Sequence, residues 1–523
     1  MKQQRKKQKN TSSSKWIDPV NVCFLIYILT VFILFLNDRY FDITKTRMTV
    51  FIVGVVIYSF FAVPYYVFGY IDKKYSKEKK HTWTEEPSVI DKIKGLFGRP
   101  EIWAVFFLCA NILACVFSID SNASWTGAKG RYFGLEIMIF VLLAFILLSL
   151  RFVGSAWIYW LFLGTFIITI SIAVIQSFGY DIFKLREEIV ERQQYMFVST
   201  IGNINVFGSY LSIAIPFFCG IFVFTNDKKV KISSAVALFI GGLGLIPVNS
   251  DNIFLALGSM FLVLLFLVIF HGKMFEYVLS ICLIVTGLMT ISLLNKINTY
   301  VYYKNGLQEK LCDPSFTIKI GLIAYALCAL TLFLKRVISA KNISSKKVAL
   351  FTLAGIILGA IVFIIVGIKQ KSSLFVFDYR WGTYRGYIWG KCFKEYKEAS
   401  ILHKIFGYGN ETTGIIMNKN YYDEMIALTG KVFDNAHSEP IQYLFTTGAF
   451  GLIAYVGLIV TSFITIFKSF KGEEFYAACL MSVVGYFSQS LVDITQPITT
   501  PLFFVMLAVC VGCARSGQEN IEK

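Results

Sequence analysis

Apolar runs long enough to cross a membrane recur along almost the whole chain. Many of them reach about 17 to 25 residues, the length at which an α-helix spans a hydrocarbon core of roughly 30 Å. Inside a bilayer such segments form helices, because hydrocarbon offers no partner for exposed backbone N–H and C=O groups. The chain has 523 residues, of which 56% are hydrophobic and 16% charged. These features exclude a soluble fold and predict an all-α polytopic membrane protein.

The positions of the runs predict about 14 transmembrane helices. Those in the first part of the chain, residues 20–368, are expected at 20–36, 48–69, 101–118, 134–150, 154–175, 205–224, 233–249, 252–270, 275–293, 318–334 and 348–367. A second group, within residues 441–514, is expected at 441–467, 474–492 and 498–513.

The basic residues predict how these helices are oriented. The formal net charge is +17, and Lys and Arg concentrate in alternate loops such as 73–80, 228–231 and 335–347. By the positive-inside rule these loops are cytoplasmic. Residues 1–19 then form a disordered basic cytoplasmic tail, and residues 515–523 a second cytoplasmic tail, in a protein of the plasma membrane. This assignment accounts for the charge without nucleic acid, for which the sequence contains no binding module.

One long polar segment, residues 369–440, interrupts the apolar pattern and is predicted to lie on the extracytoplasmic face. At about 70 residues it is too long for a simple connection, and long loops of this kind usually carry function. We expect it to contain short helices and to act as a catalytic loop above a membrane-bound substrate.

An enzyme on the outer face has no ATP and needs a substrate that arrives activated, such as a lipid-linked diphosphate sugar. Transfer from that donor requires cations for the diphosphate and a base for the acceptor hydroxyl. Arg380 and Arg385 begin the polar segment, and Arg131 precedes the span 134–150. A guanidinium suits phosphate because it donates two parallel hydrogen bonds. His437, just before the span 441–467, is the candidate base.

Simpler explanations stand beside these assignments. The arginines, Trp381 and Trp389 are also typical anchors at a membrane interface. Asp434 and Glu439 either orient His437 or are solvated loop charges. A metal site is the competing use of a wider set of side chains, although their spacing matches no known motif: His403, Asp423, Glu424, His437 and Glu439.

The order of these motifs resembles the O-antigen ligase/O-antigen polymerase superfamily. The similarity rests on Arg385-x-x-x-Trp389, Phe406-Gly407-Tyr408-Gly409, Asp434-x-Ala436-His437-x-Glu439 and the Gly-rich helix start at 446–455. Gly127-x-x-Gly130-Arg131 and Gly202-Asn203-x-Asn205 are similar to outer loops of that family. Two positions depart from the pattern: Ser438 stands where Asn is usual, and Ser250-Asp251-Asn252 stands where Ser-Arg-Gly is frequent.

The resemblance implies a metal-independent, inverting glycosyltransferase without a cofactor. Its partners would be an undecaprenyl-diphosphate-linked glycan donor, a glycan or lipid acceptor and membrane lipid. We predict His437 and Arg385 as catalytic residues. The predicted substrate-binding residues are Arg131, Arg380, Trp389, Asn203 and Glu439.

Other functions remain open at this point. A lipid-linked glycan flippase or other transporter fits the number of spans, but the spans contain few ionisable residues and show no internal repeat. A non-catalytic scaffold for envelope assembly is a further alternative. The sequence does not distinguish a polymerase from a ligase.

Overall fold

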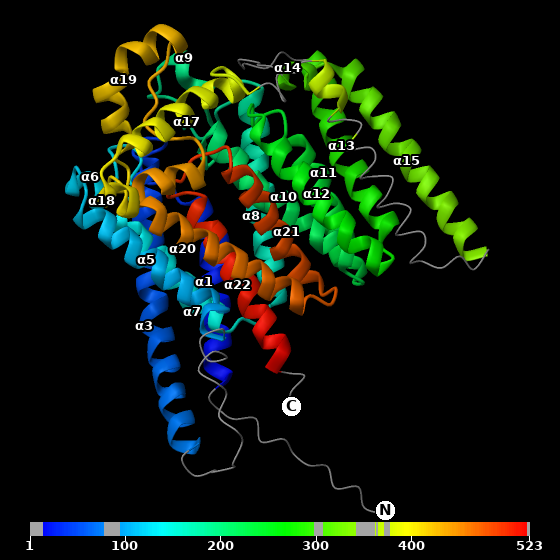
Figure 1. The fold of residues 1–523 in the computed structure, drawn as a ribbon. Helices are drawn as coiled ribbons and strands as arrows, with labels where there is room; N and C mark the ends of the chain where they lie inside the picture. Colours follow the sequence, from blue (N-terminus) through cyan, green and yellow to red (C-terminus); the bar gives the residue numbers. More distant parts are fainter. Residues whose placement is uncertain are drawn as a thin grey trace, which may run out of the picture.

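The structure is a computed structural model that describes residues 14–77, 95–297, 307–340, 361, 365–370 and 377–519. This part of the chain is mostly α-helical (Figure 1). A two-stranded antiparallel hairpin joins β1 (Phe197–Val198) to β2 (Gly202–Asn203).

The helices follow the order of the predicted spans, with short helices between them. The first are α1 (Ser14–Leu29), α2 (Val31–Leu34), α3 (Ile43–Lys77), α5 (Pro100–Val116), α6 (Ser121–Thr126), α7 (Leu135–Leu150) and α8 (Ala156–Ser177). Next come α9 (Glu191–Gln194), α10 (Ile204–Phe224), α11 (Lys228–Leu243), α12 (Asn252–His271), α13 (Met274–Ile297), α14 (Leu307–Leu311) and α15 (Pro314–Ala340). The last are α17 (Trp381–Glu398), α18 (Ile401–Phe406), α19 (Thr413–Thr429), α20 (Glu439–Ser469), α21 (Glu474–Ser490) and α22 (Thr500–Glu519).

Length and composition make 8 of the described helices candidate membrane spans, and α5, α7 and most of α22 are shorter apolar helices. A multi-pass helical membrane protein is therefore confirmed. The predicted number of about 14 spans stays a prediction. Helices α11 and α21 occupy two predicted spans but are only 16 and 17 residues long. The predicted span 348–367 lies almost wholly outside the described residues.

Described helices extend into both segments that the sequence predicts as tails. Helix α1 begins at Ser14, inside the segment predicted to be disordered, and Ile17 is buried in the core. Residues 1–13 lie outside the described part. At the other end α22 continues to Glu519, where the Arg515 guanidinium forms an ion pair with Glu101 at 2.5 Å between Nη1 and Oε1. These end segments are helical in spite of their polar composition, because they pack on the helix bundle.

Helix α10 is the centre of the bundle and is buried along nearly its whole length. Its close contact with α21 requires glycine, because a Cβ on Gly220 would lie 2.7 Å from the Ala477 backbone and one on Gly485 would lie 2.2 Å from the Ser212 carbonyl oxygen. Small residues allow membrane helices to approach in this way. The α10–α21 contact therefore fixes the start of the connection from α21 to α22, which contributes to the site below.

The polar helices gather at one end of the molecule. Figure 1 shows α17 and α19 together with α9 and α14 at the end opposite the start of α1 and the end of α22. The segment predicted as a catalytic loop does contain short helices, and it covers one end of the bundle.

Candidate functional site

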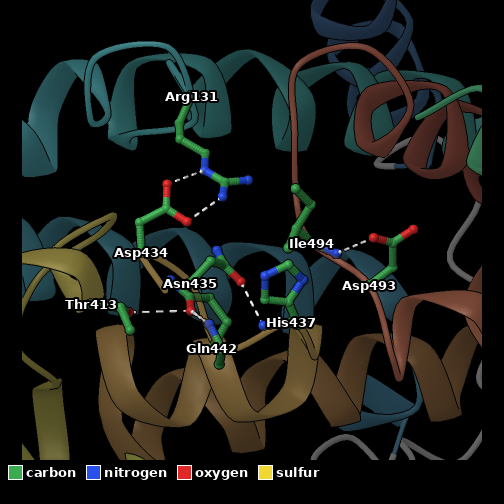
Figure 2. A network of polar contacts seen from close by, with 9 residues as sticks. Arg131, Thr413, Asp434, Asn435, His437, Gln442, Asp493 and Ile494 are labelled. Carbon is green, nitrogen blue, oxygen red and sulfur yellow. Dashed lines mark hydrogen bonds and ion pairs between the residues drawn. The ribbon is translucent and has the colours of Figure 1, made fainter. Parts of the chain in front are cut away.

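His437 lies in a short loop between α19 and α20 that is held by three side chains. Its backbone is left-handed, with φ of 52°, and the Asn435 side chain accepts a hydrogen bond from its backbone N–H at 3.0 Å. The Gln442 side chain accepts from the Ala436 N–H at 2.9 Å, and Trp389 Nε1 donates to the Ala436 carbonyl at 2.8 Å. Figure 2 shows Asn435 and Gln442 beside the imidazole ring. The backbone position of His437 is thus set by α17 and α20 together.

Arg131, in the turn before α7, forms an ion pair with Asp434 from the same loop as His437 (Figure 2). Its Nε donates to Asp434 Oδ2 at 3.1 Å, and its Nη2 donates to Asp434 Oδ1. Burial acts to lower the pKa of Arg131. The negative charges of Asp434, Glu411 and Asp493 outweigh burial, so the pKa of Arg131 is raised overall. Burial works to raise the pKa of Asp434, and the neighbouring guanidinium lowers it overall. Both groups are therefore charged at neutral pH.

Arg385 begins the regular part of α17. The three residues before it, Gly382, Thr383 and Tyr384, are all left-handed, so helical geometry starts only at Arg385. Its Nη1 donates to the Gly382 carbonyl at 2.7 Å, and its Nη2 donates to Asn252 Oδ1 at 3.3 Å. Its Nε is buried and has no partner among the described residues. Burial lowers the pKa of Arg385, opposed by the charge of Asp493.

Two buried carboxyl groups near the arginines were missed by the sequence reasoning. Asp493, between α21 and α22, accepts hydrogen bonds from Ser209 Oγ at 3.0 Å and Gln489 Nε2 at 2.8 Å, and burial raises its pKa. Glu411, before α19, is 5% exposed, and burial raises its pKa to about 7, against the attraction of Arg131. The only sequence signal for Asp493 was an acidic residue at the end of an apolar span.

These charges determine the protonation of His437. Burial first, and then the positive charges of Arg385 and Arg131, lower its pKa to about 3, with Asp434 acting in the opposite direction. The imidazole is therefore neutral at physiological pH and able to accept a proton. The structure brings His437, Arg131 and Arg385 close enough together for their charges to interact.

Strained backbone concentrates around the same residues. Non-glycine residues with positive φ are uncommon, and such strain often clusters at functional sites. Here they include His437 and Glu411 themselves and the direct neighbours of Arg131 and Arg385, which are Tyr132 and Tyr384. Asn249, three residues before Asn252, belongs to the same group.

Four other predicted site residues have different surroundings. Arg380 is exposed, and its Nε donates to the hydroxyl of its neighbour Tyr379 at 2.7 Å. Asn203 caps α10 by accepting from the Asn205 N–H at 2.9 Å. Trp389 supports the His437 loop, as described above. Glu439 is wholly buried at the start of α20.

The Glu439 carboxylate joins three helices. It accepts hydrogen bonds from the hydroxyls of Tyr455 at 3.0 Å and Tyr486 at 3.1 Å, and the latter also contacts Thr500 Oγ1 at 2.8 Å. We predict that Glu439→Ala lowers the melting temperature of the purified protein, because it leaves a buried tyrosine hydroxyl without its acceptor at a cost of about 1–3 kcal/mol. The partly exposed ion pair of Glu424 with Lys391 supplies the control, and Glu424→Ala should change stability less than Glu439→Ala. An unchanged melting temperature for Glu439→Ala would contradict this structural role.

The Gly407-Tyr408-Gly409 turn packs against a break in α20 at Gly448, where φ is 69°. The N–H groups of Tyr408 and Gly409 donate to the carbonyls of Phe445 and Thr446 at 3.2 and 2.9 Å. This backbone pairing, rather than phosphate binding, accounts for the two glycines.

Gly407→Ala should therefore destabilise the protein more than a comparable change elsewhere. Its Cβ would lie 2.1 Å from the Thr446 carbonyl oxygen, whereas a Cβ on Gly430 meets nothing within 4 Å. Gly430 is left-handed helical, which costs a residue with a side chain about 1–2 kcal/mol. Gly407, with φ of 78° and ψ of −176°, lies in a region that essentially only glycine occupies, so its variant has a larger backbone cost in addition to the steric clash. Thermal unfolding in detergent should show Gly407→Ala clearly below Gly430→Ala, and equal melting temperatures would refute the steric argument.

Known protein families provide one match. Residues 317–456 match the family model described as O-Antigen ligase, and no curated protein matches the chain. The matched segment contains Arg385, Glu411 and His437, whereas Arg131 and Asp493 lie outside it. Within the described residues, no group of three or more His, Cys, Asp and Glu side chains is placed to hold a metal ion, so the alternative set around His403 and Asp423 is not assembled there.

Proposed function

We propose, from the match of residues 317–456 to the family model described as O-Antigen ligase, that this chain is a glycosyltransferase of the O-antigen ligase/polymerase type with a specific reaction. The protein transfers a glycan from an undecaprenyl-diphosphate-linked donor to an acceptor hydroxyl on the outer face of the plasma membrane. The observation that supports this proposal most is that His437, which is neutral, lies close to Arg131 and Arg385 from separate parts of the chain.

The two arginines bind the diphosphate in this proposal. Arg131 Nη1 has no hydrogen-bond partner among the described residues, and neither does the buried Nε of Arg385. Each guanidinium thus keeps donor capacity for phosphate oxygens. Two fixed cations also stabilise the negative charge that develops on the leaving group, as in other preorganised sites. The transfer is therefore expected to proceed without a metal ion.

His437 acts as the general base. It accepts the proton of the acceptor hydroxyl while that oxygen attacks the anomeric carbon, and the bond from this carbon to the diphosphate oxygen breaks with inversion. The arginines that lower the pKa of His437 are those that bind the diphosphate. A bound diphosphate offsets their charge, so donor binding makes the imidazole more basic at the moment when a base is needed.

An aromatic cluster beside this site is the proposed glycan contact. The rings of Trp381 and Trp389 have centroids 5.2 Å apart, and those of Phe377 and Trp381 have centroids 5.3 Å apart. Phe377 is exposed, and the exposed Arg380 directly precedes Trp381 of this cluster in the sequence. Aromatic faces suit sugar rings, and Trp389 connects the cluster to the backbone next to His437. Arg380 is then a contact at the rim of the site.

The orientation of the protein follows from the same proposal. The helices α17 and α19 lie on the outer face, and both termini are cytoplasmic. The arrangement in Figure 1, with these helices opposite the first and last described residues, supports this orientation.

Reconstitution tests the reaction directly. Purified protein in liposomes is supplied with an undecaprenyl-diphosphate-linked oligosaccharide extracted from the host membrane, with and without EDTA. We expect glycan transfer with release of one undecaprenyl diphosphate per bond formed, at an unchanged rate in EDTA. A ladder of repeats would identify a polymerase, and a single transfer to a second acceptor a ligase. Failure to release undecaprenyl diphosphate with any acceptor would refute the proposal.

A further inference from the structure

Glu411 differs from the other buried carboxyl groups around the site. Glu439 and Asp493 each accept several hydrogen bonds. Glu411 is 5% exposed, and within the described part of the chain the charges of Arg131 and Asp434 act on its carboxyl group without a hydrogen bond to it. A buried polar group without a partner costs free energy, so its retention calls for a reason.

The backbone around Glu411 is held firmly in a strained conformation. Glu411 has φ of 57°, which is unfavourable for a residue with a side chain. On one side, Ser124 Oγ from α6 donates to the Asn410 carbonyl at 3.2 Å. The Gly409 N–H donates to the Thr446 carbonyl of α20 at 2.9 Å, and Thr412 Oγ1 donates to the Gly409 carbonyl at 2.7 Å. Packing against α6 and α20 therefore directs this side chain inward.

The titratable neighbours of Glu411 come from three segments. Arg131, before α7, attracts its carboxylate, and Asp434, before α20, repels it. Tyr443 of α20 is within electrostatic range, and its hydroxyl has no partner among the described residues. Burial is the largest influence and raises the pKa of Glu411 to about 7. A large fraction of the protein therefore holds this carboxyl in its protonated form at neutral pH.

We propose that Glu411 is a further residue of the diphosphate site, where its protonated carboxyl donates a hydrogen bond to a phosphate oxygen of the donor next to Arg131. This inference rests on the function proposed above. Arg131 already gives two of its donors to Asp434, so a neutral O–H donor adds to the site without a further buried charge. As the bond from the anomeric carbon to the diphosphate breaks, the Glu411 O–H keeps its proton and its hydrogen bond stabilises the negative charge that develops on the diphosphate oxygen.

Because Glu411 donates only while its carboxyl is protonated, the proposal predicts how the transfer rate depends on pH. In the free enzyme the donor form of Glu411 is lost as pH rises through about 7, so the initial rate of the wild-type enzyme at low donor concentration, which reports the free enzyme, should fall over that range. A glutamine side chain donates through its amide at every pH. Glu411→Gln should therefore keep a reduced but measurable rate without that alkaline fall. Glu411→Ala provides no donor and should lose about 10²-fold or more at every pH, as when one preorganised donor is removed.

The experiment measures initial rates from about pH 5.5 to about 9, a range that brackets the pKa of Glu411. The enzyme is in liposomes supplied with the extracted undecaprenyl-diphosphate-linked oligosaccharide. Exposed Glu398, on α17, supplies the matched control Glu398→Gln, which should keep the wild-type profile. Melting temperatures confirm that each variant is folded. The reduced rate and the flat profile of Glu411→Gln together support the proposal.

Other results would overturn it. A folded Glu411→Gln that is inactive at every pH would show that a carboxylate is needed, and that Glu411 is not a donor. Wild-type profiles for both Glu411 variants would remove Glu411 from the site while leaving the proposed function intact, provided that His437→Ala is inactive in the same assay. Inactivity of the wild-type enzyme with all acceptors would instead refute the proposed function, and this inference with it.

Discussion

His437→Ala is expected to reduce glycosyl transfer by about 10²- to 10⁴-fold, the usual contribution of a general base. The imidazole is neutral and lies beside two arginines, and its loop is fixed by Asn435, Gln442 and Trp389. Removing the ring leaves these backbone contacts in place, so the loss should be in rate rather than in folding. Initial rates in liposomes measure the effect, and gel profiles of cell-surface glycan in cells with matched membrane levels extend it to the living host.

A second histidine supplies the control. His271 ends α12, where its Nδ1 contacts the Leu267 carbonyl at 2.8 Å. His271→Ala should leave the glycan profile unchanged, because this residue lies outside the site. If His437→Ala also keeps the wild-type rate, the proposed base is wrong. Accumulation of single lipid-linked repeats in the His437→Ala cells would indicate a polymerase, and accumulation of full-length lipid-linked chains a ligase.

Arg385→Ala is the second large effect, with an expected loss of about 10²- to 10³-fold, as when a preorganised donor to a developing charge is removed. The guanidinium is partly buried at the start of the regular α17 helix, and its Nε is free for a phosphate oxygen among the described contacts. Arg385→Lys keeps the charge but loses the planar fork, so it should recover only part of the rate. Steady-state kinetics over a range of donor concentrations separate weaker binding from a slower chemical step.

Arg380 is the matched control for Arg385, five positions away in the same polar segment. It is exposed and donates to the Tyr379 hydroxyl. Because Arg380 is a contact at the rim of the site, Arg380→Ala should lower the transfer rate only a few-fold. Exposed ionic contacts contribute little free energy. An Arg380→Ala loss as large as that of Arg385→Ala would place the diphosphate further out than we propose.

Local sequence pattern was sufficient to predict the helices. Apolar runs determine them because each helix satisfies its backbone groups within its own segment, independently of its neighbours. The predicted spans in the described residues lie on helices for this reason. The exceptions are at the ends of the chain, where polar residues such as Arg515 join helices through tertiary contacts. The order of motifs similarly indicated the O-antigen ligase family, whose model matches residues 317–456, whereas the catalytic roles of His437 and Arg385 stay predictions.

The roles of most site residues depend on the tertiary structure. Gly407 was one of the motif residues in the sequence, and only the structure shows that it packs against the break in α20. Glu439 suggested a substrate contact, yet two tyrosines from α20 and α21 enclose its carboxylate. Neither outcome is visible locally, because both depend on which helices pack together.

The sequence by itself predicted the membrane-spanning helical class and the position of the polar segment, and it supplied the histidine and one arginine as candidates. Only the tertiary structure paired Arg131 with Asp434, 303 positions apart, and buried Glu411 and Asp493 near them. The physical reason is that helix formation is decided by neighbours along the chain. The charge, burial and pKa of a side chain are decided by neighbours in space.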